Sequence, residues 1–397
     1  MILGGTTDEP SSRISANMNL VSQRVALLIN YIRKDQEATF VEALRWIPNL
    51  TFLLSVLVEP QRDYDPELNR LDVRLQKTWT LRRKWRHKAG FTDDQHVHLP
   101  LDTLERLRQL QPDVIVSYEL GMRSLMSAAY RLMHRRSRLV LAVFISEHTE
   151  RSWSALRVRL RRALLRVADV VTYHGSSGKR YLESLEVPAS KLRLLPYAAH
   201  PAMVYHGPTE RTPAVRRRLL YVGQFTSRKA PLRMLEVLSR WCLAHPNRVV
   251  EISMVGRGPL RETIEMGEYP ANLEVTMVGS VAPAQMPAIL AHHGVMVFPT
   301  LADEWGLVVD EALHSGLPVV SSEYAQATLE LVIDAENGWR FRPDVDDEFY
   351  DAIDRMMRVD LAELDRMAAR GRAGVAERTP AWAGERLAEV VRAALAT

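Results

Sequence analysis

The sequence predicts an α/β protein made of two doubly wound domains that face each other across a cleft. Two long parts of the 397-residue chain alternate short apolar runs with amphipathic segments. Continuous apolar strands between helices are typical of a parallel sheet covered on both faces. Residues 201–217 interrupt the alternation with proline, polar residues and charge, as expected of a linker. A chain of this length also fits two domains better than one.

In the first half, the alternation begins near Arg24 and follows a polar leader, residues 1–20. The apolar runs that predict strands are VALLINYI, LTFLLSVL, PDVIVSY, LVLAVFIS, VADVVTYH and LRLLP. Helical spacing of apolar residues occurs in EATFVEALRW, PLDTLERLRQLQ and GMRSLMSAAYRLM, and a charged stretch follows the second strand. We assign residues 21–200 to the first domain.

The second half repeats the pattern from residue 218 onwards. Strands are predicted for LLYVG, VVEISMVG, EVTMVGS, GVMVFPT and PVVSS, and helices for LRMLEVLSRWCLAH, LRETIEM, QMPAILAHH and GLVVDEALHSG. We assign residues 218–378 to the second domain and residues 379–397, with the pattern WAGERLAEVVRAALA, to a closing helix. Ligands of open parallel sheets bind at the carboxyl ends of the strands, so site residues are expected in the loops that open on the cleft.

The charge is unevenly distributed between the two halves. Residues 1–200 contain 31 Lys and Arg against 21 Asp and Glu, whereas residues 201–397 contain 21 against 27. The first domain is therefore basic and the second acidic, which indicates that they face different partners.

The sequence favours a cytoplasmic protein. Its start, MILGGTTDEPSSR, has acidic residues where a signal peptide has an apolar segment, and its longest apolar runs are too short to span a bilayer. The single cysteine, Cys242, excludes an intramolecular disulfide and agrees with a reducing compartment; we expect it to be a small buried apolar residue.

The segment DEWGLVVDE places two carboxylates, Asp303 and Glu311, eight positions apart between a strand and a helix. Gly306 would open the helix, whose first N–H groups and positive dipole end suit an anion such as a diphosphate. Asp303 could then accept hydrogen bonds from sugar hydroxyls and Glu311 from ribose hydroxyls. The alternative is a helix-capping Asp and a solvated surface Glu.

Three other loops follow successive strands of the same domain. Gly223 ends the first strand and precedes Lys229, whose positive charge near a helix start calls for a compensating anion. Gly256 and Gly258 follow the second strand and would let a ligand approach the backbone closely, and Gly279 follows the third. Each glycine alone could be an ordinary turn residue. Together with Asp303 and Gly306 they indicate a binding site.

The second half resembles the donor-binding domain of retaining GT-B glycosyltransferases of the family 4 type (glycosyl transferases group 1). The matching motifs are VGQFTSRK, GRGP, VGS, DEWGLVVDEALHSGLPVVSS and ENGW. The resemblance is strong over residues 218–345, and residues 24–200 agree with it in strand pattern. It implies a GT-B fold whose last helix crosses back to the first domain.

The resemblance also implies site residues, a nucleoside-diphosphate sugar as donor, and neither cofactor nor metal. The implied catalytic residues are Lys229, Asp303, Glu311 and His148. The implied donor-binding residues are Gly223, Arg228, Lys229, Gly256, Gly258, Gly279, Asp303, Gly306, Leu307 and Glu311. The sequence departs from the family pattern at three places: Gln224 replaces an arginine, Asp303 replaces the commoner Glu, and YIRKDQEAT stands where a GG loop is usual. Arg228 could supply the missing positive charge.

The first domain is expected to bind the acceptor. His148 and Glu147 end the strand in VFISEHTE, and Glu119 ends PDVIVSYE. The resemblance suggests that a polar residue near His148 lies beside the reacting sugar. A histidine in a surface turn is the alternative.

Basic clusters in the first domain suggest a further partner. TLRRKWRHK (80–88) lies near Trp79 and includes Trp85, and ALRVRLRRALLRV (155–167) has a helical stripe of Leu156, Leu160, Leu164 and Val167 flanked by arginines. Such segments can lie on an anionic membrane. For residues 155–167 we favour the alternative, a stripe facing the core with a solvated arginine face. Nucleic acid is not expected, since no recognition motif accompanies the charge.

These features predict a metal-independent enzyme that transfers a hexose-type sugar, with retention, to a glycan or polyprenyl-linked acceptor in cell-surface polysaccharide synthesis. The rivals are a transferase acting on a small soluble acceptor, an epimerase or phosphorylase on the same scaffold, and a non-catalytic protein that binds sugar nucleotides.

Overall fold

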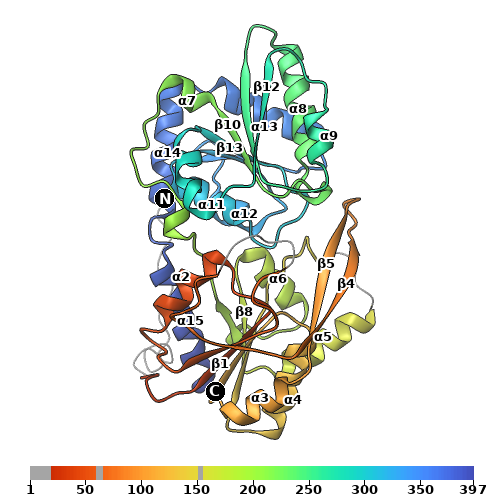
Figure 1. Cartoon of the computed structure of the whole chain (residues 1–397), viewed down its shortest axis with the longest axis vertical. Coiled ribbons are helices and arrows are strands. Elements are labelled where there is room, and N and C mark those ends of the chain that lie inside the picture. The colour runs from red at the N-terminus through yellow and green to blue at the C-terminus, as the bar shows by residue number, and fades with distance from the viewer. Residues whose placement is uncertain (1–18, 60–65, 151–154) are drawn as a thin grey trace.

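The computed structural model describes residues 19–59, 66–150 and 155–397. Its N-terminal half is built around a parallel sheet (Figure 1). Its seven strands have the order β3-β2-β1-β6-β7-β8-β9, and all neighbouring pairs are parallel. The strands are β1 (Val25–Ile29), β2 (Leu50–Leu54), β3 (Asp72–Leu75), β6 (Val114–Tyr118), β7 (Arg138–Ala142), β8 (Val170–Tyr173) and β9 (Leu192–Leu194).

Helices cover both faces of this sheet. They are α2 (Lys34–Ala43), α3 (Thr103–Leu110), α4 (Met122–Met133), α5 (Ala155–Val167) and α6 (Ser176–Ser184), with a 3₁₀ turn at Ala189–Lys191. Successive residues of β1 enter different cores: Leu27 packs with α2, and Leu28 packs with α3 to α6. Side chains of a strand point alternately to its two faces, so a strand buried on both sides must be apolar throughout, as VALLI is.

The second sheet has six parallel strands in the order β12-β11-β10-β13-β14-β15. They are β10 (Leu219–Val222), β11 (Val250–Val255), β12 (Leu273–Gly279), β13 (Val295–Phe298), β14 (Val319–Ser322) and β15 (Gly338–Phe341). The helices are α8 (Pro231–Ala244), α9 (Arg261–Glu265), α10 (Met286–Ala291), α11 (Leu307–His314), α12 (Gln326–Leu331), α13 (Asp346–Arg358) and α14 (Leu361–Val375), with 3₁₀ turns η3 (Ser227–Lys229) and η4 (Pro283–Gln285). The predicted pair of doubly wound sheets is thereby confirmed.

The chain crosses from one half of the structure to the other twice. The first passage contains a 3₁₀ turn, η2 (Pro201–Met203), and a short helix, α7 (Pro213–Arg217). The second passage leads to α15 (Pro380–Leu395), which lies against the first sheet beside α2 (Figure 1). Leu387, Val390 and Val391 of α15 share a buried core with Phe40 of α2. The last helix is thus part of the N-terminal half's core.

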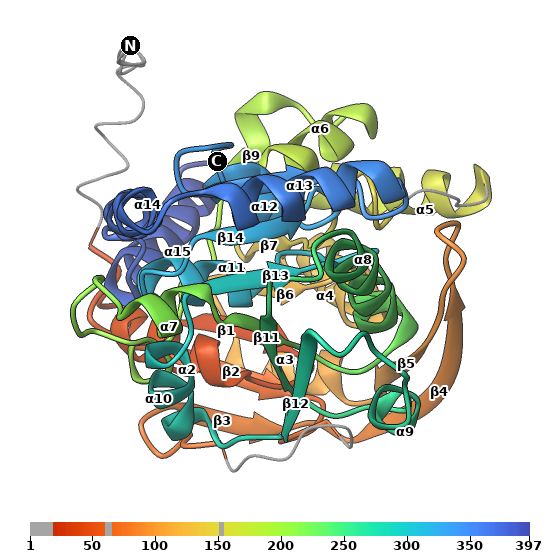
Figure 2. The ribbon, with the colours of Figure 1, turned by 90° about the horizontal axis from the view of Figure 1, so that it is seen from above.

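An antiparallel hairpin, which the sequence analysis did not predict, occupies the charged stretch after β2. It consists of β4 (Thr78–Arg86) and β5 (Thr92–Pro100) and forms a separate two-stranded sheet. Figure 2 shows it along one flank of the molecule. Most side chains of β4 are exposed, so its sequence lacks the buried apolar face on which strand prediction depends.

Helix α5 has the predicted bounds, but its apolar stripe does not face the core as expected. Leu156 and Leu160 are 66% and 59% exposed, whereas Leu164 is buried. Arg161, expected on a solvated face, is buried and pairs with Glu150. The second half of the helix packs most closely on the domain and Val158 is partly buried against the same core, but the first two turns present Leu156 and Leu160 to solvent. None of the helices in the described residues combines the length and apolar character needed to cross a bilayer.

Candidate active site

The loop between β13 and α11 places Asp303, Gly306 and Glu311 at the carboxyl edge of the second sheet. Gly306 caps α11 with φ of +97°, in the left-handed region, and a Cβ built on it would lie 2.9 Å from the Phe298 ring. Glycine is therefore required here for both backbone and packing reasons. It lets the chain turn sharply into α11, so Leu307 begins the helix directly after the loop.

Lys229 and Asp303 form an ion pair beside this helix start. The Lys229 Nζ donates to the Asp303 carboxylate, and the two side chains are only 15% and 17% exposed. Burial acts to raise the pKa of Asp303, but the positive charges of Lys229 and Arg228 outweigh it and lower that pKa. The Trp305 N–H also points to Asp303 Oδ1, at 3.4 Å. The predicted lysine and the first predicted carboxylate are therefore brought together.

Arg228 bonds to residues from both halves of the chain, and its proposed contact with the diphosphate stays a prediction. Its Nε donates to Asp93 of β5 at 2.6 Å, and its Nη1 and Nη2 donate to the Ala302 carbonyl (3.2 Å) and to Gln224 Oε1 (3.4 Å). Arg228 thus ties the hairpin to the C-terminal half. Asp93 is a site residue that the sequence analysis missed, because nothing local links it to an arginine 135 positions away.

Glu311 lies in the second turn of α11 and is 5% exposed. Among the described residues, its carboxylate has no hydrogen-bond or ion-pair partner within the chain. Burial, and then the negative charges of Asp35 and Asp310, raise its pKa to about 8. A buried carboxyl group without a partner is costly to retain for stability alone, and it is well suited to accept hydrogen bonds from ligand hydroxyls.

The loops after β10, β11 and β12 pack against each other at their glycines. The N–H of Gly223 donates to Val255, that of Gly256 to Gly279, and that of Phe225 to Arg257. A Cβ on Gly256 would lie 1.9 Å from the Gly223 carbonyl oxygen, and one on Gly258 would lie 2.5 Å from that of Phe225. Packing between the loops is thus sufficient to require glycine at both positions, and the close approach of a ligand to Gly256 and Gly258 stays a prediction.

His148 lies where the two halves of the chain meet. Its Nε2 donates to the Leu301 carbonyl at 2.7 Å, and its ring stacks on Tyr324 with centroids 3.8 Å apart. It is buried, so it is not the solvated turn histidine that was considered as the alternative. It contacts the segment just before Asp303.

The two predicted glutamates of the first half have separate environments. Glu147 pairs with Arg180 at 2.8 Å and accepts from Ser177, so its partners belong to α6. Glu119 has φ of +70° at the end of β6, and both its carboxylate oxygens accept from Asn30 Nδ2 at 2.9 Å. Burial raises the pKa of Glu119, although its side chain is accessible to solvent. This combination is typical of a group that lines a cleft.

Glu304, in the other half of the chain, likewise combines an exposed side chain with a raised pKa. It is accessible to solvent, yet surrounding protein and then the negative charge of Glu119 raise its pKa to about 8. Glu304 was not singled out from the sequence, although it follows Asp303 directly. Carboxyl groups from the two halves of the chain, Glu119 and Glu304, therefore influence each other electrostatically.

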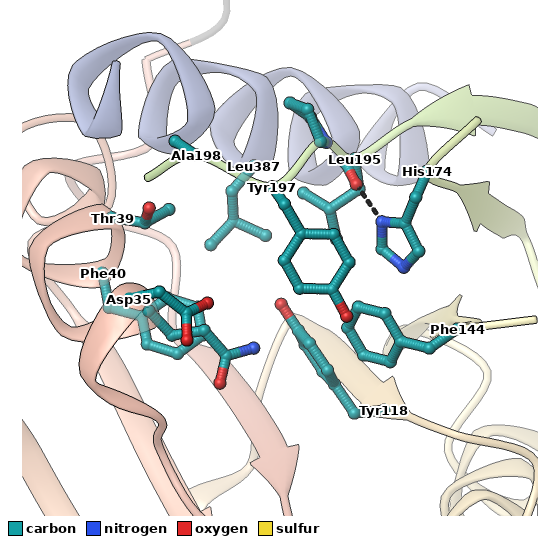
Figure 3. A pocket seen from close by; sticks show the side chains of 12 residues that line it. Asp35, Thr39, Phe40, Tyr118, Phe144, His174, Leu195, Tyr197, Ala198 and Leu387 are labelled. Atoms are coloured by element: carbon teal, nitrogen blue, oxygen red, sulfur yellow. Dashed lines mark hydrogen bonds between the residues drawn. The ribbon is translucent and has the colours of Figure 1, made fainter. Parts of the chain in front are cut away.

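A cavity of about 20 Å³ lies among α2, α15 and the ends of β6 and β9 (Figure 3). Tyr118, Phe144, His174 and Tyr197 form one wall, and Asp35 lies opposite. This volume suits about one water molecule, so it is not a sugar site. His174 is buried here and donates to the Leu195 carbonyl, and burial lowers its pKa to about 3.

Residues 216–358 match the family described as Glycosyl transferases group 1. The α-D-kanosaminyltransferase of Streptomyces kanamyceticus is 23% identical over 244 residues, which cover 58% of this chain and 62% of that relative. The chain therefore aligns with less than two thirds of the curated relative.

Solved structures of low sequence identity share the fold over nearly the whole chain. HepE from Anabaena, in complex with UDP, superposes with a TM-score of 0.70 at 15% identity, covering 93% of this chain and 99% of that one. The lipopolysaccharide outer core galactosyltransferase WaaB superposes with a TM-score of 0.66 at 13% identity, covering 93% and 99%. The chain therefore has the GT-B fold, and its second domain matches the model of the group 1 glycosyltransferases.

Proposed function

We propose that this protein is a retaining glycosyltransferase that moves a hexose-type sugar from a nucleoside diphosphate to a glycan or lipid-linked acceptor. The observation that carries the proposal is the arrangement around α11: a buried Lys229–Asp303 pair at the helix start and a buried, unpartnered Glu311 one turn further on. The HepE structure contains UDP and WaaB is a galactosyltransferase, and both share this fold.

Each residue would have a distinct role. The Glu311 carboxylate accepts hydrogen bonds from the ribose hydroxyls, while Lys229 and the N-terminus of α11 face the diphosphate. Asp303 orients Lys229 and accepts from a sugar hydroxyl. The C1–O bond to the diphosphate breaks, the acceptor oxygen bonds to C1 from the same face, and the acceptor proton passes to the departing phosphate. The negative charge that develops on the diphosphate is stabilised by Lys229.

The proposal is tested first by a thermal-shift panel of nucleoside diphosphates and their sugars, followed by a transfer assay with the best donor. We expect a raised melting temperature with one base, because ligands that bind only the folded state stabilise it. NMR should show a product with the anomeric configuration of the donor, and EDTA should leave the rate unchanged.

Other outcomes of these assays would support one of the alternative functions. Donor binding without transfer or hydrolysis would indicate a non-catalytic sugar-nucleotide-binding protein, and an altered free sugar nucleotide would indicate an epimerase. A sugar phosphate formed from inorganic phosphate would indicate a phosphorylase. An inverted product, or a rate abolished by EDTA and restored with Mg²⁺, would overturn the mechanism.

We also propose that the first domain docks on an anionic membrane, where a lipid-linked acceptor would be presented. Leu156 and Leu160 are exposed on α5 beside exposed Arg159 and Arg166. Strand β4, which is basic, lies on the same flank as α5 (Figures 1 and 2), and its second residue, Trp79, is 62% exposed. Each basic residue near an anionic surface contributes about 1 kcal/mol, so such a cluster supports reversible attachment that salt weakens.

Vesicle co-sedimentation tests this attachment. We expect the protein to pellet with anionic but not neutral vesicles at low salt, and less at high salt. The double variant Leu156→Ser/Leu160→Ser should pellet less, because its helix has lost the apolar contact with the bilayer. Leu243→Ser is the matched control, since Leu243 is 71% exposed on α8 of the acidic half. Equal, negligible pelleting under all conditions would reject membrane docking and favour a soluble acceptor.

A further inference from the structure

Gln326, the first residue of α12, joins three parts of the structure through one side chain. Its Oε1 accepts from the Gly178 N–H of α6 at 2.9 Å, and its Nε2 donates to the Ile145 carbonyl after β7 at 3.0 Å. The same Nε2 donates to the Glu304 carbonyl at 2.7 Å. The side chain is 1% exposed. Two of the three partners belong to the first half of the chain and one to the loop that carries Asp303.

The surrounding backbone is fitted to this amide. A Cβ on Gly178 would lie 2.7 Å from the Ile145 carbonyl oxygen and 3.1 Å from Gln326 Oε1, so only glycine leaves room for both. One turn later, the Glu330 carboxylate accepts from the Ser176 N–H at 2.6 Å. Glu330 therefore makes the same kind of contact with α6 as Gln326, but it has no bond to the Asp303 loop.

The bond to Glu304 orients the peptide that contacts Asp303, together with backbone bonds from Asp303 to Tyr324 and from Ala327 to Trp305. In a trans peptide the C=O and the following N–H point in opposite directions. When the Glu304 carbonyl points to Gln326, the Trp305 N–H is directed away from it, towards Asp303 Oδ1 at 3.4 Å. Asp303 in turn holds Lys229. A continuous series of polar contacts thus runs from the first half of the chain to Lys229.

We propose that Gln326 is a positioning residue for the transfer reaction, which makes the alignment of the Asp303 loop depend on contact between the two domains. This inference rests on the proposed function for its kinetic part. A displacement of about 1 Å at a reacting centre can lower a rate by about a hundredfold. Loss of the Gln326 bonds should therefore affect turnover more than nucleotide binding, since the Glu311 carboxylate is not in this series.

The test compares Gln326→Leu, which keeps the side-chain volume but no hydrogen bonds, with Glu330→Ala. We expect kcat to fall by about 10- to 100-fold in Gln326→Leu, with the Kd for the nucleoside diphosphate changed less than about threefold. Glu330→Ala should keep kcat within about twofold, because the bond that it loses does not reach the loop. Hydrogen exchange of the segment 299–306 should be faster in Gln326→Leu and unchanged in Glu330→Ala.

A second variant keeps the comparison informative if Gln326→Leu does not fold. Gln326→Glu retains the acceptor for Gly178 but sets a second oxygen against two carbonyl oxygens, so it should show the same kinetic and exchange changes. Exchange of residues 299–306 as in the wild type, or equal losses of kcat in the Gln326 and Glu330 variants, would overturn the proposal. If the wild type transfers no sugar, the proposed function fails, while the exchange measurement still decides whether Gln326 holds the loop.

Discussion

Replacing Lys229 with alanine is expected to lower kcat by at least about tenfold and by up to about a thousandfold, the range seen when one stabilising donor is removed from a reacting centre. The ammonium group lies beside the start of α11, where the diphosphate would depart, and its effect should be larger on kcat than on the KM for the donor. Steady-state kinetics with the donor identified by thermal shift provide the measurement. Arg233→Ala is the control, since Arg233 is a positively charged residue of α8 whose partner is Asp346 of α13 rather than Asp303.

Loss of stability must be separated from loss of catalysis in this variant. Removing Lys229 leaves the largely buried Asp303 without its ion-pair partner, with only the more distant charge of Arg228 to offset it, so the variant should lose stability. The double variant Lys229→Met/Asp303→Asn removes both charges and should recover much of the melting temperature without recovering kcat. Near-normal turnover in either variant would reject the role assigned to Lys229.

Replacing Glu311 with glutamine is expected to weaken nucleoside diphosphate binding by about 1–3 kcal/mol, the scale of charged hydrogen bonds in a buried site. Ribose hydroxyls donate to the ionised carboxylate, and in the free protein the pKa of Glu311 is raised to about 8. Wild-type affinity should therefore increase as the pH rises from about 6 to 8 and level off above that, because below its pKa the carboxyl group must first lose a proton. Calorimetry across this range should find no such dependence in Glu311→Gln.

The same substitution should stabilise the protein at alkaline pH. Because its pKa is raised from 4.5 to about 8 on folding, the contribution of Glu311 to stability is fully present below pH 4.5 and is lost as the pH rises towards 8. At pH 8, urea unfolding should show Glu311→Gln to be more stable than the wild type by at least about 2 kcal/mol, with little difference at pH 4.5.

Asp310→Asn is the control that distinguishes the effect of a Glu311 substitution on nucleotide affinity from its effect on stability. Burial raises the pKa of Asp310 to about 7, and its carboxylate is directed towards His314 and Arg378. Asp310→Asn should therefore change stability with pH and shift the rise in nucleotide affinity to lower pH, since one charge that raises the Glu311 pKa is gone, but leave the affinity above pH 8 unaltered. A Kd for the nucleotide that does not change in Glu311→Gln would contradict the assignment of Glu311 to the ribose.

Local patterns determined the two sheets and the donor-side loops. A strand buried on both faces must be apolar along its length, and an amphipathic helix must repeat its apolar residues at helical spacing, so both can be identified within about ten residues of sequence. The turn into α11 was likewise predicted locally, from Gly306 and from the positions of Asp303 and Glu311 on either side of it. These features predicted where Lys229, Asp303 and Glu311 belong in the fold, although not that Lys229 and Asp303 pair.

Contacts between distant segments were decided only by the tertiary structure. The Arg228–Asp93 pair and the three bonds of Gln326 join residues up to 181 positions apart, and no local periodicity records them. The β4–β5 hairpin escaped prediction because its strands lack a buried apolar face. The leucines of α5 were expected in the core, but a stripe of leucines is the same in sequence whether protein, lipid or water lies against it. Hydrophobic spacing specifies which faces of an element are apolar, and only the packing of the whole chain specifies what covers them.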